Sequence, residues 1–253
     1  MVTITVDMVM ITEAITTMTT NTINQPAEEL STPALLRLLQ LSSVSLPVGG
    51  YAFSQGLEYA VECGWVTTMQ ATRDWLSIQL QETIALIDLP VLHGAMHAIA
   101  TGDETTWLKW NDLILASRET RELRLTDTAM GEALVRVLKS IEVPLPAAVT
   151  ECESGISYVA LYALPAVQWG IPFNAAATGL AWSWLENQIA AATKLVPLGQ
   201  TQAQQLLSDL QRLIPATIAT AMQVEEDDIG GSLPALAIAS ARHETQYTRL
   251  FRS

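Results

Sequence analysis

Apolar residues recur along most of this chain at the spacing of an α-helix. The clearest stripe is formed by Leu76, Leu80, Ile84 and Ile87, at successive steps of four, four and three residues. The triplet Asp88-Leu89-Pro90 predicts the end of this helix, because proline has no N–H for the helical ladder. The pattern indicates a helix with one buried face in the first half of the chain.

An earlier helix is predicted to begin at Thr32-Pro33, where a capping hydroxyl precedes a proline in the first turn. Leu35, Leu38 and Leu39 are expected to line its apolar face. The segment Leu46-Pro47-Val48-Gly49-Gly50 interrupts the pattern, so the helix should end before it.

The rest of the chain continues the helical period. Asp103 is predicted to cap a helix that carries Trp107, Trp110 and Ile114 inward. Two later faces consist of Leu123, Met130, Leu134, Val137 and Ile141, and of Ala203, Leu206, Leu210, Leu213, Thr217 and Ala221. With short joins and no repeat period, these elements predict an all-α fold, a single compact bundle of about eight to ten helices.

A long uncharged stretch favours burial over membrane insertion. Residues 154–185 contain no Asp, Glu, Lys or Arg, but Gly170-Ile171-Pro172 interrupts them near the middle. A spanning helix would leave backbone groups unsatisfied in lipid at that point, so two buried helices are expected. In the second of these, Ala175, Gly179 and Ser183 are spaced by four, which predicts close helix packing at the centre of the bundle.

The two ends of the chain differ from this pattern. Residues 1–30 are predicted to be a flexible N-terminal extension, in which Val2–Val6 alternates like a short strand. Residues 31–253 are predicted to be one helical domain, including a C-terminal tail at about residues 232–253. The acidic run at residues 225–228 should be a solvated loop, because like charges in a row favour water over packing.

Composition narrows the choice of partners. Apolar residues make up 49% of the chain and charged residues 15%, and the formal net charge is −13. A nucleic acid or an anionic membrane surface is disfavoured, because each attracts basic rather than acidic proteins. Cys63 and Cys152 form no disulfide framework and are interpreted as buried, reduced thiols, which fits a cytoplasmic protein.

The chain has no recognisable catalytic motif. There is no Gly-x-x-x-x-Gly-Lys-Ser/Thr loop for phosphates and no Gly-x-Ser-x-Gly elbow, and Gly49, Gly50 and Gly56 are interpreted as turn residues. His93 and His97 lie four apart on a predicted helix, a spacing that can place both rings on one metal. No third ligand is obvious, so we expect neither a resident metal nor a stably bound cofactor, and a metal-dependent enzyme is only an alternative.

Two arginine-rich stretches are the candidates for recognition. In residues 117–124, Arg118 and Glu122 lie four apart, as in a helix surface laced with ion pairs or an interface where arginines meet acidic groups. The C-terminal stretch, residues 240–253, gathers three arginines, a tyrosine and a phenylalanine in a chain short of bases and aromatics. Because arginine and aromatic side chains anchor interfaces, this end is predicted to bind a partner.

Four separated segments resemble the urease accessory protein UreF family. They are Leu46–Glu58, Ser117–Thr120, Pro197–Gln200 and the closing Arg242–Ser253, and the likeness runs from about residue 35 to residue 253. Residues 1–30 have no counterpart in the pattern, and Ala52 stands where a hydroxyl residue is expected.

The resemblance implies a cytoplasmic, all-helical, commonly dimeric scaffold that is not itself an enzyme. With UreD (also called UreH) it would recruit the GTPase UreG and assist nickel insertion into apo-urease, and its tail would become ordered against UreD. An alternative is that the chain regulates UreG by lending it an arginine. The predicted partner-binding residues are Arg242, His243, Glu244, Tyr247, Arg249, Leu250, Phe251 and Arg252 in the tail, and Arg118, Arg121 and Arg124 upstream.

Overall fold

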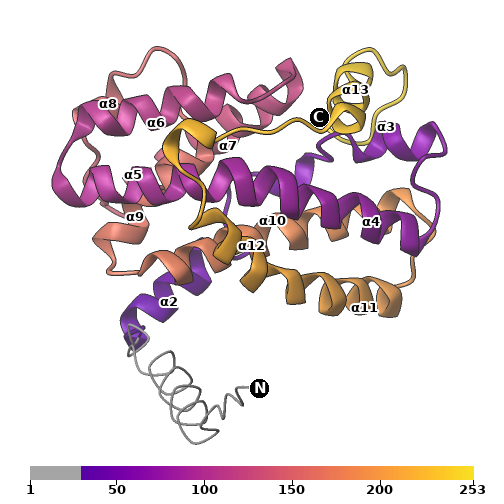
Figure 1. Ribbon diagram of the computed structural model, residues 1–253, viewed down its shortest axis with the longest axis horizontal. Coiled ribbons are helices and arrows are strands. Elements are labelled where there is room, and N and C mark those ends of the chain that lie inside the picture. Colours follow the sequence, from indigo (N-terminus) through magenta and orange to yellow (C-terminus); the bar gives the residue numbers. More distant parts are fainter. Residues whose placement is uncertain (1–29) are drawn as a thin grey trace, which may run out of the picture.

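The computed structural model describes residues 30–253, and this part of the chain is helical without strands (Figure 1). It contains ten helices when consecutive helical stretches are counted once, which confirms the all-α bundle. The predicted N-terminal extension and its Val2–Val6 alternation lie in residues 1–29, outside the described residues. The α-helices are α2 (Thr32–Leu41), α3 (Leu57–Glu62), α4 (Met69–Gln79), α5 (Leu89–Thr101), α6 (Glu104–Ala116), α7 (Arg121–Ser140), α8 (Ala147–Thr150), α9 (Tyr158–Gln168), α10 (Phe173–Leu195), α11 (Gln200–Leu210), α12 (Ile214–Ala221) and α13 (Pro234–His243).

Several helices begin at a side-chain cap, as the sequence indicates. Asp103 accepts from the Thr106 amide at 2.9 Å, which confirms its predicted role at the start of α6. Ser31, one residue before the predicted position, caps α2 through the Ala34 amide. Such caps satisfy backbone donors that have no partner within the helix.

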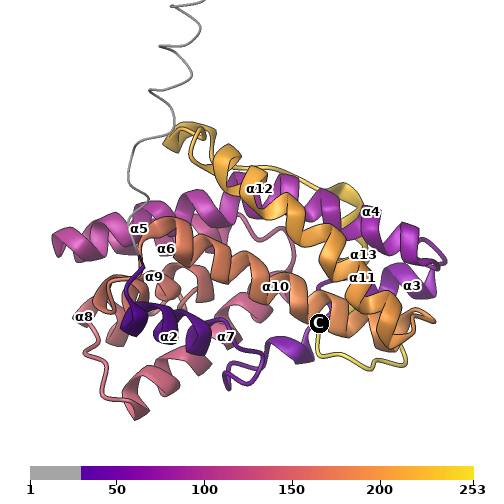
Figure 2. The ribbon, with the colours of Figure 1, turned by 90° about the horizontal axis from the view of Figure 1, so that it is seen from below.

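Helix α10 lies at the centre of the bundle, as predicted from its small residues. It contacts α2, α3, α4, α5, α9, α11 and α12, and Figure 2 shows it crossing the middle of the molecule. At Gly179 a Cβ atom would meet the side chains of Leu38 and Tyr162 within 3 Å. The missing side chain therefore lets α2 and α9 approach α10 closely. The two helices predicted from residues 154–185 are α9 and α10, joined at residues 169–172.

The predicted boundary at Asp88-Leu89-Pro90 coincides with the start of α5 at Leu89, but the helix does not end there. Residues Met69–Thr101 form one continuous helical run, in which a π-helical segment, η2 (Leu80–Asp88), joins α4 to α5. Pro90 cannot donate to the Leu86 carbonyl oxygen, which instead accepts from the Gly230 amide at 3.3 Å. A distant loop thus satisfies the acceptor that the proline leaves open, and the helix continues.

Within the described residues, Met69–Thr101 is also the one helix long and apolar enough to cross a membrane by length and composition. A core helix meets the same two criteria. Here 61% of the most apolar window is buried inside the fold, and Leu76, Leu80, Ile84 and Ile87 face the core as predicted. The run is therefore explained as a core element of the bundle.

Two burial predictions are wrong. On α2 the buried residues are Ala34 and Leu41, with Leu38 packed partly beside them, whereas Leu35 and Leu39 are exposed. The buried set (Ala34, Leu38, Leu41) and the predicted set (Leu35, Leu38, Leu39) both have helical spacing. The face with the small Ala34 is the one that packs against α10, because a small residue allows the two helices to approach closely. Cys63 is exposed and Cys152 half-buried, and both are free thiols.

Gly131 provides a test of the packing of α7 against the segment before α9. A Cβ atom there would overlap the Ile156 carbonyl oxygen and lie 2.8 Å from its carbon, and backbone atoms cannot swing aside. We expect Gly131→Ala to lower the free energy of unfolding, because overpacking costs about 1–3 kcal/mol, more than the roughly 1 kcal/mol gained in helix propensity. Urea denaturation measures the change.

Gly230→Ala is the matched control, since a Cβ atom at Gly230 meets nothing within 4 Å and the residue does not need a left-handed conformation. A Gly131→Ala protein as stable as the Gly230→Ala protein would contradict the packing described for α7.

Candidate partner-binding site

The C-terminal tail, residues 244–253, folds back onto its own chain. In Figure 1 it lies beside α13 and α3, and the C-terminus comes close to the start of α3. The expectation that the tail becomes ordered against UreD stays a prediction. Three parts of the chain that are far apart in sequence meet there: the start of α3 with the loop before it, the first turns of α7, and the tail with α13.

Two buried carboxylates hold the tail. Glu58, on α3, accepts from the Leu250 amide at 2.6 Å and from the Phe251 amide at 2.9 Å. Glu122, on α7, accepts from the Arg249 guanidinium at 2.6 Å. His243, at the end of α13, lies between the two, with Nε2 3.0 Å from Glu58 and Nδ1 2.8 Å from Glu122. We call Glu58, Glu122, His243 and Arg249 the tail cluster.

The last residues of the tail reach the loop before α3. The Ser253 carbonyl oxygen accepts from the amides of Ser54 and Gln55, and the Ser253 hydroxyl bonds that of Thr126. The loop turns through two glycines with positive φ, Gly49 and Gly56, which confirms that these are turn residues. The Ala52 carbonyl oxygen accepts from the Arg252 amide at 2.9 Å, so this contact needs no hydroxyl side chain at position 52.

The tail presents some side chains outward while it buries others. Phe251 is buried in a second apolar cluster with Leu57, Ala192 and Ala239, and His243 is fully buried. Tyr247 is fully exposed, and Leu250 is 63% exposed. Arg242, Glu244 and Arg252 are also exposed, and Arg249 keeps a third of its side chain in solvent. Of the predicted residues, His243 and Phe251 are buried in internal contacts, and Arg249 donates to Glu122 while part of its side chain stays in solvent. The exposed residues are Arg242, Glu244, Tyr247, Leu250 and Arg252.

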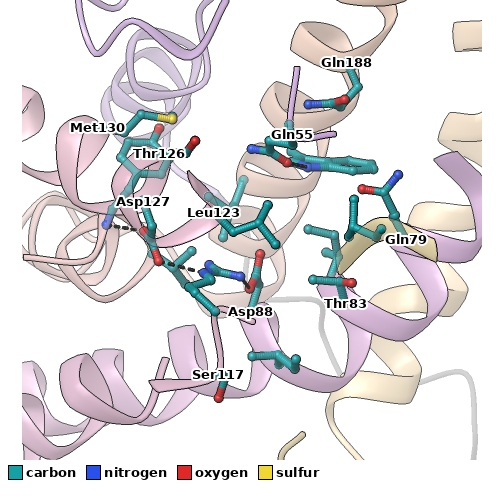
Figure 3. A pocket seen from close by; sticks show the side chains of 18 of the residues that line it. Gln55, Gln79, Thr83, Asp88, Ser117, Leu123, Thr126, Asp127, Met130 and Gln188 are labelled. Atoms are coloured by element: carbon teal, nitrogen blue, oxygen red, sulfur yellow. Dashed lines mark hydrogen bonds and ion pairs between the residues drawn. The ribbon is translucent and has the colours of Figure 1, made fainter. Parts of the chain in front are cut away.

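Arg118 belongs to a separate buried ion triad, shown in Figure 3. Its guanidinium donates to Asp88 at 2.8 Å and to Asp127 at 2.9 Å. Asp127 also accepts from the Tyr158 amide at 2.7 Å. The predicted surface pair of Arg118 with Glu122 is wrong, because α7 begins at Arg121 and Arg118 lies before the helix. The triad fixes the start of α9 against α7.

A cavity of about 100 Å³ lies beside the triad. Figure 3 shows Asp88 and Ser117 at one end and Gln188 at the other. Trp184 donates to the Gln55 carboxamide at 2.9 Å, whereas the buried Gln188 Oε1 has no partner among the described residues. Burial raises the pKa of Asp88, and the nearby Arg118 opposes this shift.

Comparisons with known proteins give the family of this chain. A family model for UreF matches residues 66–211. The chain is also 56% identical to the urease accessory protein UreF of a Marinomonas strain, over 87% of this chain and 94% of that protein.

The chain belongs to the UreF family. It is also 47% identical to the urease accessory proteins UreF of Pseudomonas putida and Teredinibacter turnerae, in each case over 87% of this chain and 98% of that protein. The resemblance predicted from four short segments is thereby confirmed.

The tail cluster of this UreF family member does not include the other residues that the sequence singles out. Arg121 is exposed at the start of α7, and Arg124 donates to the carbonyl oxygens of Leu115 and Ser154. His93 and His97 are exposed on α5, and desolvation lowers the pKa of His93, with a smaller effect from His97. No group of three or more His, Cys, Asp or Glu side chains within residues 30–253 is placed to hold a metal.

Sequence reasoning missed the residues that hold the tail, Glu58 and Glu122. In the sequence Glu58 stands out only as part of a family-like segment, and the helical spacing pairs Glu122 with the wrong arginine. A usable signal is that Glu58 stands between Leu57 and the apolar stretch Tyr59-Ala60-Val61. An acid in such a stretch is placed to be buried, and a buried acid is almost always paired. This setting therefore predicts that Glu58 has a partner, without naming it. No spacing rule could name partners 185 to 193 residues away.

Glu58→Gln tests the hold on the tail. A carboxamide nitrogen cannot accept hydrogen bonds, so at least one of the three donors that meet Glu58 loses its partner. We expect the free energy of unfolding to fall by up to about 3 kcal/mol and trypsin to cleave faster after Arg249 and Arg252. Glu62→Gln, on the exposed side of the same helix, should change neither, and equal behaviour of the two variants would refute the role of Glu58.

Asp88 and Asp127 should respond differently to neutralisation. Because burial raises the pKa of Asp88, its contribution to stability is full below the ordinary value of about 4 and is lost as the pH rises through the raised value. We expect Asp88→Asn to gain stability relative to the unchanged protein as the pH rises above about 4. Denaturation curves at several pH values measure this difference.

Asp127→Asn is the contrasting variant. It should lose stability at neutral pH, because Asp127 also accepts from Tyr158 N and Ser157 Oγ. A constant offset between Asp88→Asn and the unchanged protein at all pH values would contradict the assignment for Asp88.

Proposed function

We propose that this chain acts in urease maturation as a non-catalytic scaffold. In this role it binds UreD (UreH), and the pair recruits the GTPase UreG and assists nickel insertion into apo-urease. The proposal rests on membership of the UreF family and on relatives that carry the name urease accessory protein UreF. Nickel is the cargo of the complex, and the proposal assigns no resident cofactor to this chain.

The observation that carries the proposal is the exposure of Tyr247 and Leu250 on a tail that Glu58 and Glu122 hold against the bundle. A segment whose backbone is already held loses less conformational entropy when a partner covers its exposed side chains, and tyrosine is a common anchor of interfaces. Tyr247 is fully exposed and Leu250 is 63% exposed, while the neighbouring Phe251 and His243 are buried. The tail is therefore held in one conformation for recognition by UreD.

The charges of the tail cluster support a role in binding rather than in catalysis, because none of them is free to act on a substrate. The charged side chains of the tail cluster are all engaged with one another or with tail amides. The net charge of −13 disfavours nucleic acid and anionic membranes as partners. From membership of the UreF family we also propose a cytoplasmic protein that works as a homodimer within the maturation complex.

The alternative, an arginine lent to UreG, has fewer candidates than the sequence offers. Arg118 is buried and held by Asp88 and Asp127, so it is not available to a partner's transition state. Arg124 bonds two carbonyl oxygens of its own chain. Only Arg121 of the three is exposed with no hydrogen bond from its side chain in the described residues, and nothing else favours this alternative.

The scaffold role is tested with point variants rather than with a chain that ends at residue 241. That truncation would also remove His243 and Phe251, which hold the fold. We expect Tyr247→Ala combined with Leu250→Ala to weaken co-purification with UreD by about 30-fold or more, because each replaces an exposed anchor. Urease activation in cells that carry this variant should fall in parallel.

Met222→Ala is the matched control, since Met222 is a large exposed apolar residue outside the tail. Equal retention of UreD by the double variant and by Met222→Ala would refute the role of the tail. The fold of each variant is checked by its denaturation midpoint.

A further inference from the structure

The cavity beside the Arg118 triad borders the π-helical segment η2. Thr83 and Asp88 of this segment line it, as does Gln79 directly before the segment. π-Helical turns are rare and are frequently found at functional sites. A water molecule needs roughly 10–15 Å³ of such space, so a cavity of about 100 Å³ accommodates a molecule of several non-hydrogen atoms. The cavity is therefore a candidate site for a small ligand, whose chemistry follows from the groups around it.

Two of the lining carboxamides have oxygens that the fold leaves unused. Gln79 Nε2 donates to the Trp75 carbonyl oxygen at 3.0 Å, and Asn187 Nδ2 donates to the Ser183 carbonyl oxygen at 2.9 Å. Because a carbonyl oxygen only accepts, these contacts fix which atom of each carboxamide is the nitrogen. Neither carboxamide oxygen accepts a hydrogen bond from residues 30–253. In Figure 3 the Gln79 oxygen is on the side that faces the other labelled residues.

Gln188 and Asp88 add two further acceptors. Gln188 is 1% exposed, and its Oε1 has no partner within the described part of the chain. Asp88 is also buried, and Arg118 donates to its Oδ1, so that no donor of the described residues reaches Oδ2. Gln55 differs, because its oxygen accepts from Trp184 and its nitrogen is left. Acceptors therefore predominate, and a ligand that brings N–H donors is favoured because a buried acceptor without a donor costs free energy.

The charges around the cavity favour a cation. Asp88 and Asp127 carry two negative charges, and Arg118 between them carries one positive charge. The α9 amide that donates to Asp127 has no net charge. Glu119 adds a carboxylate where the cavity reaches the surface, since it lines the cavity and is exposed, and it accepts from Ser232 at 2.6 Å. Carboxylates thus outnumber guanidinium groups along the wall, which attracts cations and repels anions.

Apolar side chains line the cavity between its polar ends. Figure 3 shows Asp88 at one end and Gln188 at the other, and Leu123, Met130 and Leu180 contribute to the wall. Methylene groups are stabilised against such a wall, because their contact with water is removed. A bare inorganic ion gains nothing there. The arrangement suits a molecule with a donor at each end and an aliphatic chain between them.

We propose that this cavity binds a short aliphatic diamine in its doubly protonated form. One ammonium group pairs with Asp88, and the other donates to Gln188 at the opposite end. Gln79 and Asn187 provide further acceptors, and the methylene chain lies against Leu123. Each ammonium group carries three N–H donors and no acceptor, as the surplus of oxygens requires. The site does not depend on the proposed role in urease maturation, and neither proposal fails with the other.

Isothermal titration calorimetry on the full chain at neutral pH tests the ligand class, with 1,4-diaminobutane as the probe. We expect a dissociation constant on the order of 1 mM or lower, which six non-hydrogen atoms can support. n-Butylammonium has a single ammonium group and should bind about tenfold more weakly, because it donates nothing at the Gln188 end. Tetramethylammonium carries a charge without N–H donors and should not bind at the same ionic strength. Absence of diamine binding, or equal binding of the three cations, would overturn the proposal.

Gln188→Met tests the second end of the site. The variant replaces an unpartnered carboxamide with an apolar side chain of similar length, so the fold should be at least as stable as before. Its affinity for 1,4-diaminobutane should fall about tenfold, to that of n-butylammonium, whereas its affinity for n-butylammonium should not change. Gln204→Met, on the exposed surface of α11, is the matched control and should alter neither affinity. Equal losses for both cations in Gln188→Met would refute the two-ended site.

Asp88→Asn tests the first end. Removal of the carboxylate charge should weaken the binding of 1,4-diaminobutane and of n-butylammonium alike, each by about tenfold, because both place an ammonium group there. The denaturation midpoint of the variant without ligand confirms that it is folded. Unchanged affinity for both cations in a folded Asp88→Asn protein would show that the ammonium group is not held by Asp88, and the proposal would be wrong.

Discussion

Glu58 and Glu122 are buried carboxylates, and the arrangement of the C-terminal tail and α13 depends on the donors that reach them. A buried carboxylate is stable only when its oxygens are hydrogen-bonded and its charge is balanced. Glu58 obtains its donors from His243, Leu250 and Phe251, and Glu122 obtains them from His243 and Arg249. Each carboxylate contacts His243 of α13 through one oxygen and also accepts from the tail. The same two side chains therefore fix the positions of both α13 and the tail.

Helix α7 links the tail to the rest of the bundle through polar side chains in its first turns. Glu122 and Thr126, one turn apart, face the tail. Asp127, the next residue, faces Arg118 and the first amide of α9. One short stretch of α7 therefore connects the tail to the helix that packs against α5, α6 and α10. Such buried polar contacts add little to net stability compared with an apolar core, and here they connect the tail, α7 and α9 to one another.

The sequence predicted the elements whose partners are local. Leu76, Leu80, Ile84 and Ile87 repeat within one helix, and Asp103 caps the helix that directly follows it. It failed where a distant atom decides the outcome. The helix continues through Pro90 because the Gly230 amide donates to the Leu86 carbonyl oxygen. Arg118 is buried because it pairs with Asp88, which lies 30 residues earlier in the chain. The buried face of α2 was ambiguous for a related reason, since only the position of α10 selects Ala34 over Leu35.

The tail shows why composition alone does not separate internal contacts from an external surface. Arginines and aromatics gather there for both uses. Phe251 and Ser253 are buried while Leu250 and Arg252 are exposed, an alternation that an extended segment produces on any flat surface. The buried set fixes the segment, and fixing it determines which side chains face outward. A segment of this kind therefore requires its internal contacts in order to present an external surface, and the carboxylates of α3 and α7 are as much a part of that surface as Tyr247.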